Sequence, residues 1–274
     1  MGVIIPPSIP MILYGIVTET SIVELFTAGI LPGVFLTVLL GGYTVIVNRH
    51  IPRQGFSWVE LGQSLRDGVW SLIMPVILLG GIYSGYFSPT ESAAVALAYS
   101  LVIERFVHKQ LSLRDLYETA LDTTTMMGSL FPLLAIALSI NLLLTSEQVP
   151  AQLADWMSSA VESKTTFLLL MNALLLIVGC VMDMASAILV LAPLLQQMGD
   201  TYGIDPIHLG VIMTVNLEIG LLTPPVGLNL IIAMTAFREP FGVIVRGVLP
   251  FIALMLFGLL VLSFVPQLSL FLLQ

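Results

Sequence analysis

The sequence predicts an all-α protein that crosses a membrane several times. Hydrophobic residues make up 57% of its 274 residues and charged residues only 9%, and the mean hydropathy is +1.02. Soluble domains carry far more charge. The strands of a membrane barrel would alternate apolar and polar residues, so helices are favoured. Uncharged stretches long enough to span a bilayer as helices lie at residues 25–47, 69–87, 126–146, 165–182, 219–237 and 247–274.

The composition also excludes several kinds of chemistry. The net charge of −8 argues against nucleic acid as a partner. Cys180 is the only cysteine, so an intrachain disulfide and a cysteine metal cluster are impossible. The sequence has no GxxxxGK[ST] phosphate loop and no HExxH metal motif, and its three histidines are scattered. We therefore expect neither an enzyme nor a bound cofactor.

One short phrase occurs twice, 218 residues apart. Pro6-Pro7 recurs as Pro224-Pro225, and the sequence GILP at 29–32 recurs as GVLP at 247–250. Adjacent prolines remove two backbone donors and cost about 3 kcal/mol each inside a helix, so both copies predict a break in a membrane helix. Broken helices at matching places of two repeats are typical of the binding site of a secondary transporter.

The charges flanking these breaks predict that the two repeats are inverted. Basic residues cluster at 49–66 and at 105–114, which places both loops in the cytoplasm. The segment between them then crosses outward and returns, turning near residues 84–91. The first copy leads to Glu19 outside, whereas the second leads to Arg238 inside.

The repeat offset also predicts the domain organisation. Residues 57–274 would be the second repeat and residues 1–56 the end of the first, so about 160 residues of the first repeat would be missing before Met1. The chain would then be a fragment, or another chain would supply the front half; the alternative is a complete protein with a duplicated motif. Within the second repeat we expect scaffold spans and amphipathic arms at 57–125, a transport-domain hairpin and broken helices at 126–237, and a terminal scaffold span at 238–274.

Shorter signals predict where several helices begin. The patterns Ser57-x-x-Glu60 and Ser112-x-x-Asp115 resemble capping boxes, and each precedes an amphipathic stretch that suits an interfacial helix. A third such stretch follows Pro150. Residues 184–199 are short for a span and have acids on both sides, which predicts one limb of a re-entrant hairpin.

Two acids lie deepest in apolar sequence, Asp183 and Glu218. A carboxylate at the centre of a membrane helix costs about 2.5–3.5 kcal/mol, so each is a candidate for function. The alternatives are an acid at an aqueous mouth or a structural ion pair, for instance between Glu218 and Arg246.

Residues 216–229 form the densest cluster of polar and helix-breaking residues. Carbonyls released by the prolines, the Thr223 hydroxyl and the amides of Asn216 and Asn229 are hard oxygen donors that suit a small hard cation. The N-termini of half-helices beside the break would attract a substrate carboxylate. The alternative is a proline kink packed by glycines. Ser8 is the only hydroxyl beside the first break.

Three motifs, at residues 5–12, 80–91 and 216–229, closely resemble the large membrane subunit of tripartite ATP-independent periplasmic (TRAP) transporters, the DctM-like family, over its C-terminal portion. The resemblance implies an elevator-type transporter of the ion transporter superfamily kind, in the bacterial inner membrane. It implies sodium-driven uptake of an organic acid, a C4-dicarboxylate or sialic acid, from a periplasmic substrate-binding protein. It also implies a small four-helix membrane subunit as partner.

The resemblance further implies site residues. For sodium, bound through side chains or carbonyls, they are Pro7 and Ser8 at the first break, Asp183 and Ser186 in the hairpin, and Gly220, Thr223, Pro225 and Asn229 at the second break. For the substrate they are Ser8, Asn216, Thr223 and Gly227. The family's first hairpin has no counterpart here, so one sodium site and half of the substrate cavity should be absent from this chain. The alternative function is a non-transporting membrane scaffold or a subunit of an ion-translocating, energy-transducing complex.

Overall fold

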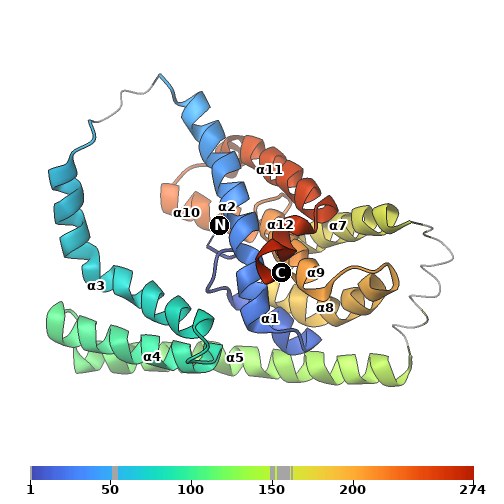
Figure 1. The fold of residues 1–274 in the computed structure, drawn as a ribbon, viewed down its shortest axis with the longest axis horizontal. Helices are drawn as coiled ribbons and strands as arrows, with labels where there is room; N and C mark the ends of the chain where they lie inside the picture. The colour runs from blue at the N-terminus through green and yellow to red at the C-terminus, as the bar shows by residue number, and fades with distance from the viewer. Residues whose placement is uncertain (1, 51–54, 149–151, 153–160, 162) are drawn as a thin grey trace. The chain divides into compact units, whose positions relative to one another are not determined.

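A computed structural model of the chain describes all residues except 1, 51–54, 149–151, 153–160 and 162 (Figure 1). The described residues form helices and their connections, as predicted. They make up two compact units: Met1–Val47 together with Leu133–Gln274, and Asn48–Pro132.

In the larger unit the first proline pair precedes a short helix. Pro6-Pro7 is a cis peptide bond, and helix α1 (Ile9–Thr18) begins directly after the buried Ser8. The Ser8 hydroxyl caps this helix by accepting the Met11 N–H at 3.3 Å. The helix ends at Glu19, which has a φ of 54°, and the long helix α2 (Ile22–Val47) follows.

The second proline pair is followed by the same succession of elements. Pro224-Pro225 is also cis, and helix α10 (Leu228–Phe237) has 10 residues, as α1 does. It ends at Arg238 with a φ of 56°, and the long helix α11 (Phe241–Phe264) follows. The repeat seen in the sequence is therefore a repeat of local structure. That its two copies are inverted in a membrane stays a prediction.

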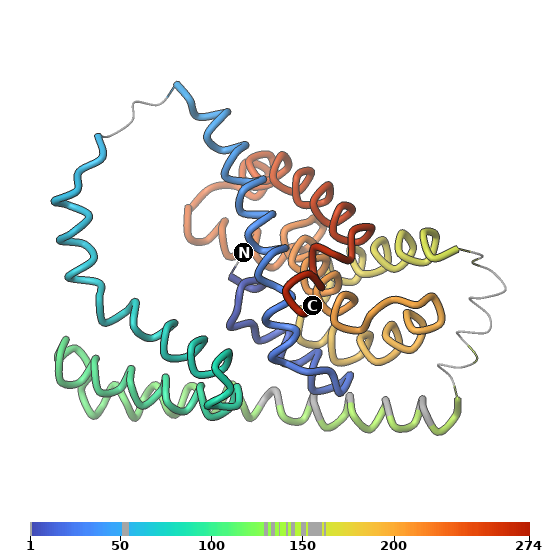
Figure 2. The backbone as a smooth tube through the Cα atoms, viewed as in Figure 1, coloured from blue at the N-terminus to red at the C-terminus, as the bar shows by residue number. Residues whose placement is uncertain are grey.

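A helical hairpin lies where the acids at 183 and 200 suggested one. Helices α7 (Lys164–Val181) and α8 (Met184–Thr201) are joined only by Met182 and Asp183, and Figure 2 traces the backbone through this tip. Near the other end of α8, the Gln196 side chain donates to the Thr18 carbonyl at 3.2 Å. This hydrogen bond ties the hairpin to α1.

Helix α9 (Pro206–Leu221) is the centre of the larger unit. Its residues from His208 to Gly220 are all buried, and it packs against α7, α8, α2 and α11. The contact with α7 is a contact of two backbones: a Cβ added to Gly220 would lie 2.6 Å from the Gly179 backbone. Helices α12 (Gln267–Leu270) and η2 (Phe271–Leu273) complete this unit against α2.

The smaller unit pairs helices α3 (Trp58–Tyr83) and α4 (Pro89–Val102), followed by a π-helical turn, η1 (Ile103–Val107). Helix α5 (Leu113–Ser146) starts in this unit. Both predicted helix starts are confirmed: Ser57 Oγ accepts the Glu60 N–H at 3.3 Å, and Ser112 Oγ accepts the Asp115 N–H at 3.1 Å. The hydrogen bonds that Ser112 donates in return hold the pKa of the Asp115 carboxyl below its usual range.

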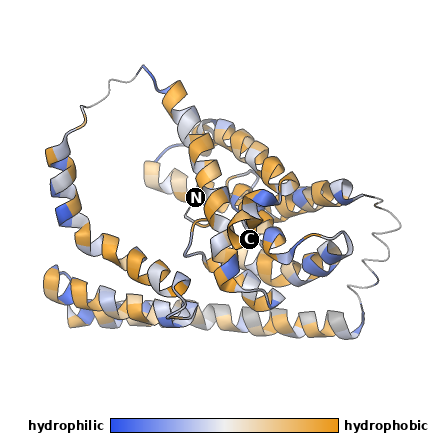
Figure 3. Ribbon diagram, viewed as in Figure 1, coloured by the Kyte–Doolittle hydropathy of each residue, from blue (hydrophilic) through white to orange (hydrophobic). Residues whose placement is uncertain are grey.

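Four of the described helices, α2, α3, α7 and α11, are long and apolar enough to cross a membrane. Figure 3 shows that apolar residues predominate along these helices. Val38 of α2 and Phe257 of α11 are more than half exposed. Lipid contact explains this exposure, because apolar side chains cost nothing in a bilayer.

Three sequence expectations are refined by the helix bounds. The expected last span, 247–274, ends at Phe264 because Pro266 cannot donate to the preceding turn. The expected span 219–237 is divided by the proline pair into the end of α9 and α10. A single helix, α5, runs through both the arm after Ser112 and the span 126–146. The stretch after Pro150 lies outside the described residues.

The contact of the two glycines leads to a first prediction. Gly220→Ala should lower the melting temperature of the purified protein in detergent, because the new methyl group meets rigid backbone and overpacking costs about 1–3 kcal/mol. Gly41→Ala in α2 is the matched control, because nothing lies within 4 Å of its added Cβ. Alanine is the better helix former by up to about 1 kcal/mol, so the control should melt at the same or a higher temperature. Equal melting temperatures for the two variants would contradict the close contact.

Candidate functional site

The hairpin tip meets the second break. The Gly227 N–H, which opens α10, donates to the Cys180 carbonyl in the last turn of α7 at 3.3 Å. The backbone contact of Gly179 with Gly220 lies close to this hydrogen bond. Gly179 directly precedes Cys180, and Gly220 comes four residues before the proline pair. The end of α7, just before the predicted sodium residues Asp183 and Ser186, therefore lies beside the second break. Among the described residues, no hydrogen bond joins Asp183 or Ser186 to the break, and their role toward sodium stays a prediction.

Two helices begin at this place, and their first turns differ. Asp183 caps α8: its Oδ2 accepts the Ser186 N–H at 2.9 Å, while the side chain stays exposed and Ser186 is half-buried. Gly227 opens α10 with a φ of 54° and has no side chain to cap it. Within the described residues, the N–H groups of Leu228 and Asn229 have no acceptor. The N-terminus of α10 is therefore open to an anion.

The second break frees backbone oxygen. The carbonyl of Leu221 would accept from the third or fourth residue ahead, and both of these are proline. The Gly220 carbonyl is taken by the Thr223 N–H at 2.9 Å. The half-buried Thr223 donates its hydroxyl hydrogen to the Ile219 carbonyl at 2.7 Å, which leaves the lone pairs of the hydroxyl oxygen available.

The other predicted residues of the break flank this oxygen cluster in the sequence. Pro225 is exposed and Asn229 is half-buried. In the described residues, no three His, Cys, Asp or Glu side chains lie together as a metal cluster. A cation at this break would be held by carbonyl, hydroxyl and amide oxygens, and such hard ligands suit a hard cation.

Asn216 lies inside the helix packing. It is completely buried, and its Nδ2 donates to the Asn172 side chain at 2.7 Å and to the Asn172 backbone carbonyl at 3.1 Å. Asn172 in turn donates to Ser263 of α11 at 3.0 Å. The Asn216 Oδ1 has no hydrogen-bond partner within the described residues. This amide therefore joins α7 to α9 one turn below the glycine contact, and its predicted role toward substrate stays a prediction.

The first break is anchored to α2. The Ile4 carbonyl would lie 2.5 Å from a Cβ on Gly29, and the Ile5 side chain packs against Gly33. Pro7 is exposed, and the Ser8 hydroxyl is engaged in its helix cap. No hydrogen bond of the described residues joins Pro7 or Ser8 to the second break.

Glu218 points away from the contact with α7. It is only 9% exposed and lies about 200° around the α9 axis from Asn216. The ion pair with Arg246 considered for it does not form, because Arg246 is on an exposed face of α11. The described structure therefore does not contain the ion pair that was considered as a structural role for Glu218.

Sequence reasoning missed two parts of this site, the Gly179 backbone and the Cys180 carbonyl. It predicted the carbonyls that the prolines release but did not name Leu221, although two prolines at the third and fourth positions ahead of a residue always leave its carbonyl without a helical donor. The same rule marks Val3 in the first copy. The sequence near Gly179 and Cys180 gives no sign of their role, because each acts through a contact with a residue more than 40 positions later in the chain.

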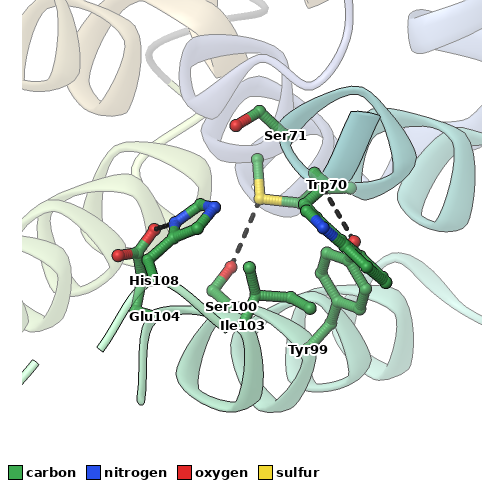
Figure 4. A pocket seen from close by; sticks show the side chains of 8 residues that line it. Trp70, Ser71, Tyr99, Ser100, Ile103, Glu104 and His108 are labelled. Atoms are coloured by element: carbon green, nitrogen blue, oxygen red, sulfur yellow. Dashed lines mark hydrogen bonds and ion pairs between the residues drawn. The ribbon is translucent and has the colours of Figure 1, made fainter. Parts of the chain in front are cut away.

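The smaller unit contains a separate cavity of about 130 Å³ between α3, α4 and η1. Figure 4 shows its side chains: Glu104 and His108 face each other on one side, and Trp70 and Tyr99 lie on the other. The Tyr99 hydroxyl donates to the Trp70 carbonyl at 2.8 Å. None of the residues predicted for sodium or substrate lines this cavity.

Comparison with known proteins agrees with the resemblance. The family model of the tripartite ATP-independent periplasmic transporter DctM component matches residues 1–268. The chain is 41% identical to the C4-dicarboxylate TRAP transporter large permease protein DctM of Pseudomonas aeruginosa and 38% identical to the ectoine/5-hydroxyectoine large permease protein UehC of Ruegeria pomeroyi, covering 98% of this chain and 64% of each relative. It is 35% identical to the sialic acid TRAP transporter permease protein SiaT of Haemophilus influenzae, covering 99% of this chain and 44% of that one.

The chain therefore spans less than two thirds of the length of the relatives it matches. The residues that match the family model include both proline pairs and helices α7 and α8. The chain belongs to the DctM component family, the large permease subunits of tripartite ATP-independent periplasmic transporters.

Proposed function

We propose that this chain is part of the permease subunit of a sodium-coupled secondary transporter that imports an organic acid across the bacterial inner membrane. A periplasmic binding protein would deliver the solute, and a small four-helix membrane subunit would accompany the permease. The observation that supports the proposal is the meeting of the hairpin tip with the second break, where Gly227 donates to the Cys180 carbonyl.

The break supplies what a sodium ion needs. The Leu221 carbonyl has no helical donor, the Thr223 hydroxyl oxygen has free lone pairs, and the Asn229 amide is on the second residue of α10. These neutral oxygens bind a cation without a permanent negative charge at membrane depth, which would be costly in the empty site. Coupling follows if the ion draws these oxygens together and so orders the start of α10.

The open N-terminus of α10 supplies what a carboxylate needs. Two N–H groups lack acceptors there, and the helix dipole adds a partial positive charge. The relatives named for C4-dicarboxylate and sialic acid support an organic acid as the solute.

Transport itself gives the first test of this proposal. Proteoliposomes containing the full-length permease with its small subunit should accumulate the solute only with an inward sodium gradient and with the binding protein present. Collapsing the gradient with a sodium ionophore should stop accumulation at an unchanged membrane potential. Equal uptake with potassium in place of sodium would reject sodium coupling.

The hydroxyl at the break gives a sharper test. Thr223→Ala should raise the sodium concentration for half-maximal uptake at least about tenfold, because a polar contact to a charged group is worth about 1.5–3 kcal/mol. Asn229→Ala should act in the same direction. Thr235→Ala is the matched control, since Thr235 makes the same kind of hydrogen bond, to the Ile231 carbonyl at 3.1 Å, from an exposed position in α10.

Thr223→Ser keeps the hydroxyl and should restore the sodium response of the wild type. If Thr223→Ala and Thr235→Ala gave the same sodium titration, the hydroxyl would have only a structural role, and the site assignment would be wrong.

A further inference from the structure

The smaller unit has an apolar groove on the side of η1 opposite the cavity of Figure 4. The groove encloses about 250 Å³ between the end of α4 and the start of α5. Its walls are apolar apart from Arg105 and Ser112. They are formed by Leu101, Val102, Phe106, Leu111, Leu113 and Leu116.

The loop that closes the groove is held in place by its own hydrogen bonds. The His108 N–H donates to the Ile103 carbonyl at 2.9 Å, which makes η1 a π turn, and the N–H groups of Gln110 and Leu111 both donate to the Glu104 carbonyl. Arg105 Nη1 donates to the Leu111 carbonyl at 2.9 Å. The guanidinium is therefore fixed at the rim of the groove, with its other donors free for a ligand.

The acids of this segment are engaged elsewhere. Glu104 lies 3.0 Å from His108 Nδ1 on the α3 side of the π turn, as Figure 4 shows. Glu118 pairs with Arg114 at 2.8 Å, and Asp115 accepts the Ser112 N–H at 2.9 Å in the helix cap. Arg105 is thus the one ionic side chain that lines the groove. Lys109 adds a second exposed cation to the same loop.

Two aromatic residues on the other side of η1 are typical of a membrane interface. Trp70 of α3 and Tyr99 of α4 line the neighbouring cavity, and aromatic rings of this kind gather at the level of lipid headgroups. The basic residues of the loop predict the cytoplasmic leaflet, whose anionic lipids attract cations. A fixed guanidinium above an apolar groove complements a phosphate joined to an acyl chain.

We propose that this groove binds a phospholipid of the cytoplasmic leaflet that carries a net negative charge. Its phosphate sits on the Arg105 guanidinium, and part of one acyl chain fills the groove between α4 and α5. Such a lipid would hold the start of α5 against α4 and so brace the arm. The inference does not depend on sodium coupling or on the identity of the solute.

Native mass spectrometry of the full-length permease complex, purified in detergent and mixed with phosphatidylglycerol or phosphatidylcholine, tests the proposal. We expect phosphatidylglycerol to stay bound preferentially. Arg105→Gln should weaken its binding about fivefold, the value for one cation near a lipid surface. Arg114→Gln is the matched control: it removes a nearby cation, in the first turn of α5, that is paired with Glu118 and does not line the groove.

Two further arms separate the lipid from other occupants. Val102→Trp fills the groove while Arg105 stays in place, and it should also reduce lipid binding; an unchanged melting temperature shows that each variant is folded. Glycerol phosphate, which has the headgroup but no chain, should not displace the lipid. Equal binding of the two lipids, equal effects of Arg105→Gln and Arg114→Gln, or displacement by glycerol phosphate would each overturn the proposal.

Discussion

The direct contact between the backbones of Gly179 and Gly220 is the constraint on which the larger unit depends. Any side chain at either position would push α7 and α9 apart, and with them the hairpin tip and the second break. Because the two backbones touch, the Cys180 carbonyl reaches the Gly227 N–H beyond the proline pair. The Asn172–Asn216 hydrogen bonds hold the same two helices one to two turns away. Polar groups buried in this way are strong only while each has its partner.

This architecture puts much of the chemistry of the break on the backbone. The prolines leave the Leu221 carbonyl without a donor, and the start of α10 leaves two N–H groups without an acceptor. The unpaired polar groups of the site therefore follow from the course of the backbone. In the proposed cation site, side chains such as Thr223 add oxygen ligands to those that the backbone supplies. This division also explains the repeat: the elements shared by the two copies are the proline pair, a short helix, a left-handed residue and a long helix. Most side chains differ between them.

The sequence predicted the local features of this fold well. Prolines, serine caps and the acids on both sides of residues 184–199 act on their neighbours, so the breaks, the starts of α3 and α5, and the limb α8 could be found from spacing. The residues of α7 were expected as a span and not as the other limb of the hairpin. The span ending at 274 was overestimated because hydropathy does not register Pro266. The pairing of Asn172 with Asn216 and the fit of Gly179 to Gly220 were not predicted. Both depend on contacts between residues about 40 positions apart. The presence of a glycine or an asparagine at one position does not indicate which distant residue it contacts. The alternative partner proposed for Glu218 failed for the same reason.

The two helix starts near the hairpin tip differ in what they offer to an anion. At α8 the Asp183 carboxylate occupies the positive end of the helix, so this end is already neutralised by the chain itself. At α10 the first residue is glycine, which gives the sharp left-handed turn but offers no oxygen to the amides ahead of it. A substrate carboxylate would therefore be drawn to α10 rather than to α8. The Leu221 carbonyl and the Thr223 hydroxyl, the oxygens proposed to bind the cation, lie within a few residues of that same start. A bound cation and a bound carboxylate would then stabilise each other across the break by Coulomb attraction in a medium of low dielectric constant. Their mutual stabilisation gives a physical basis for binding the two together.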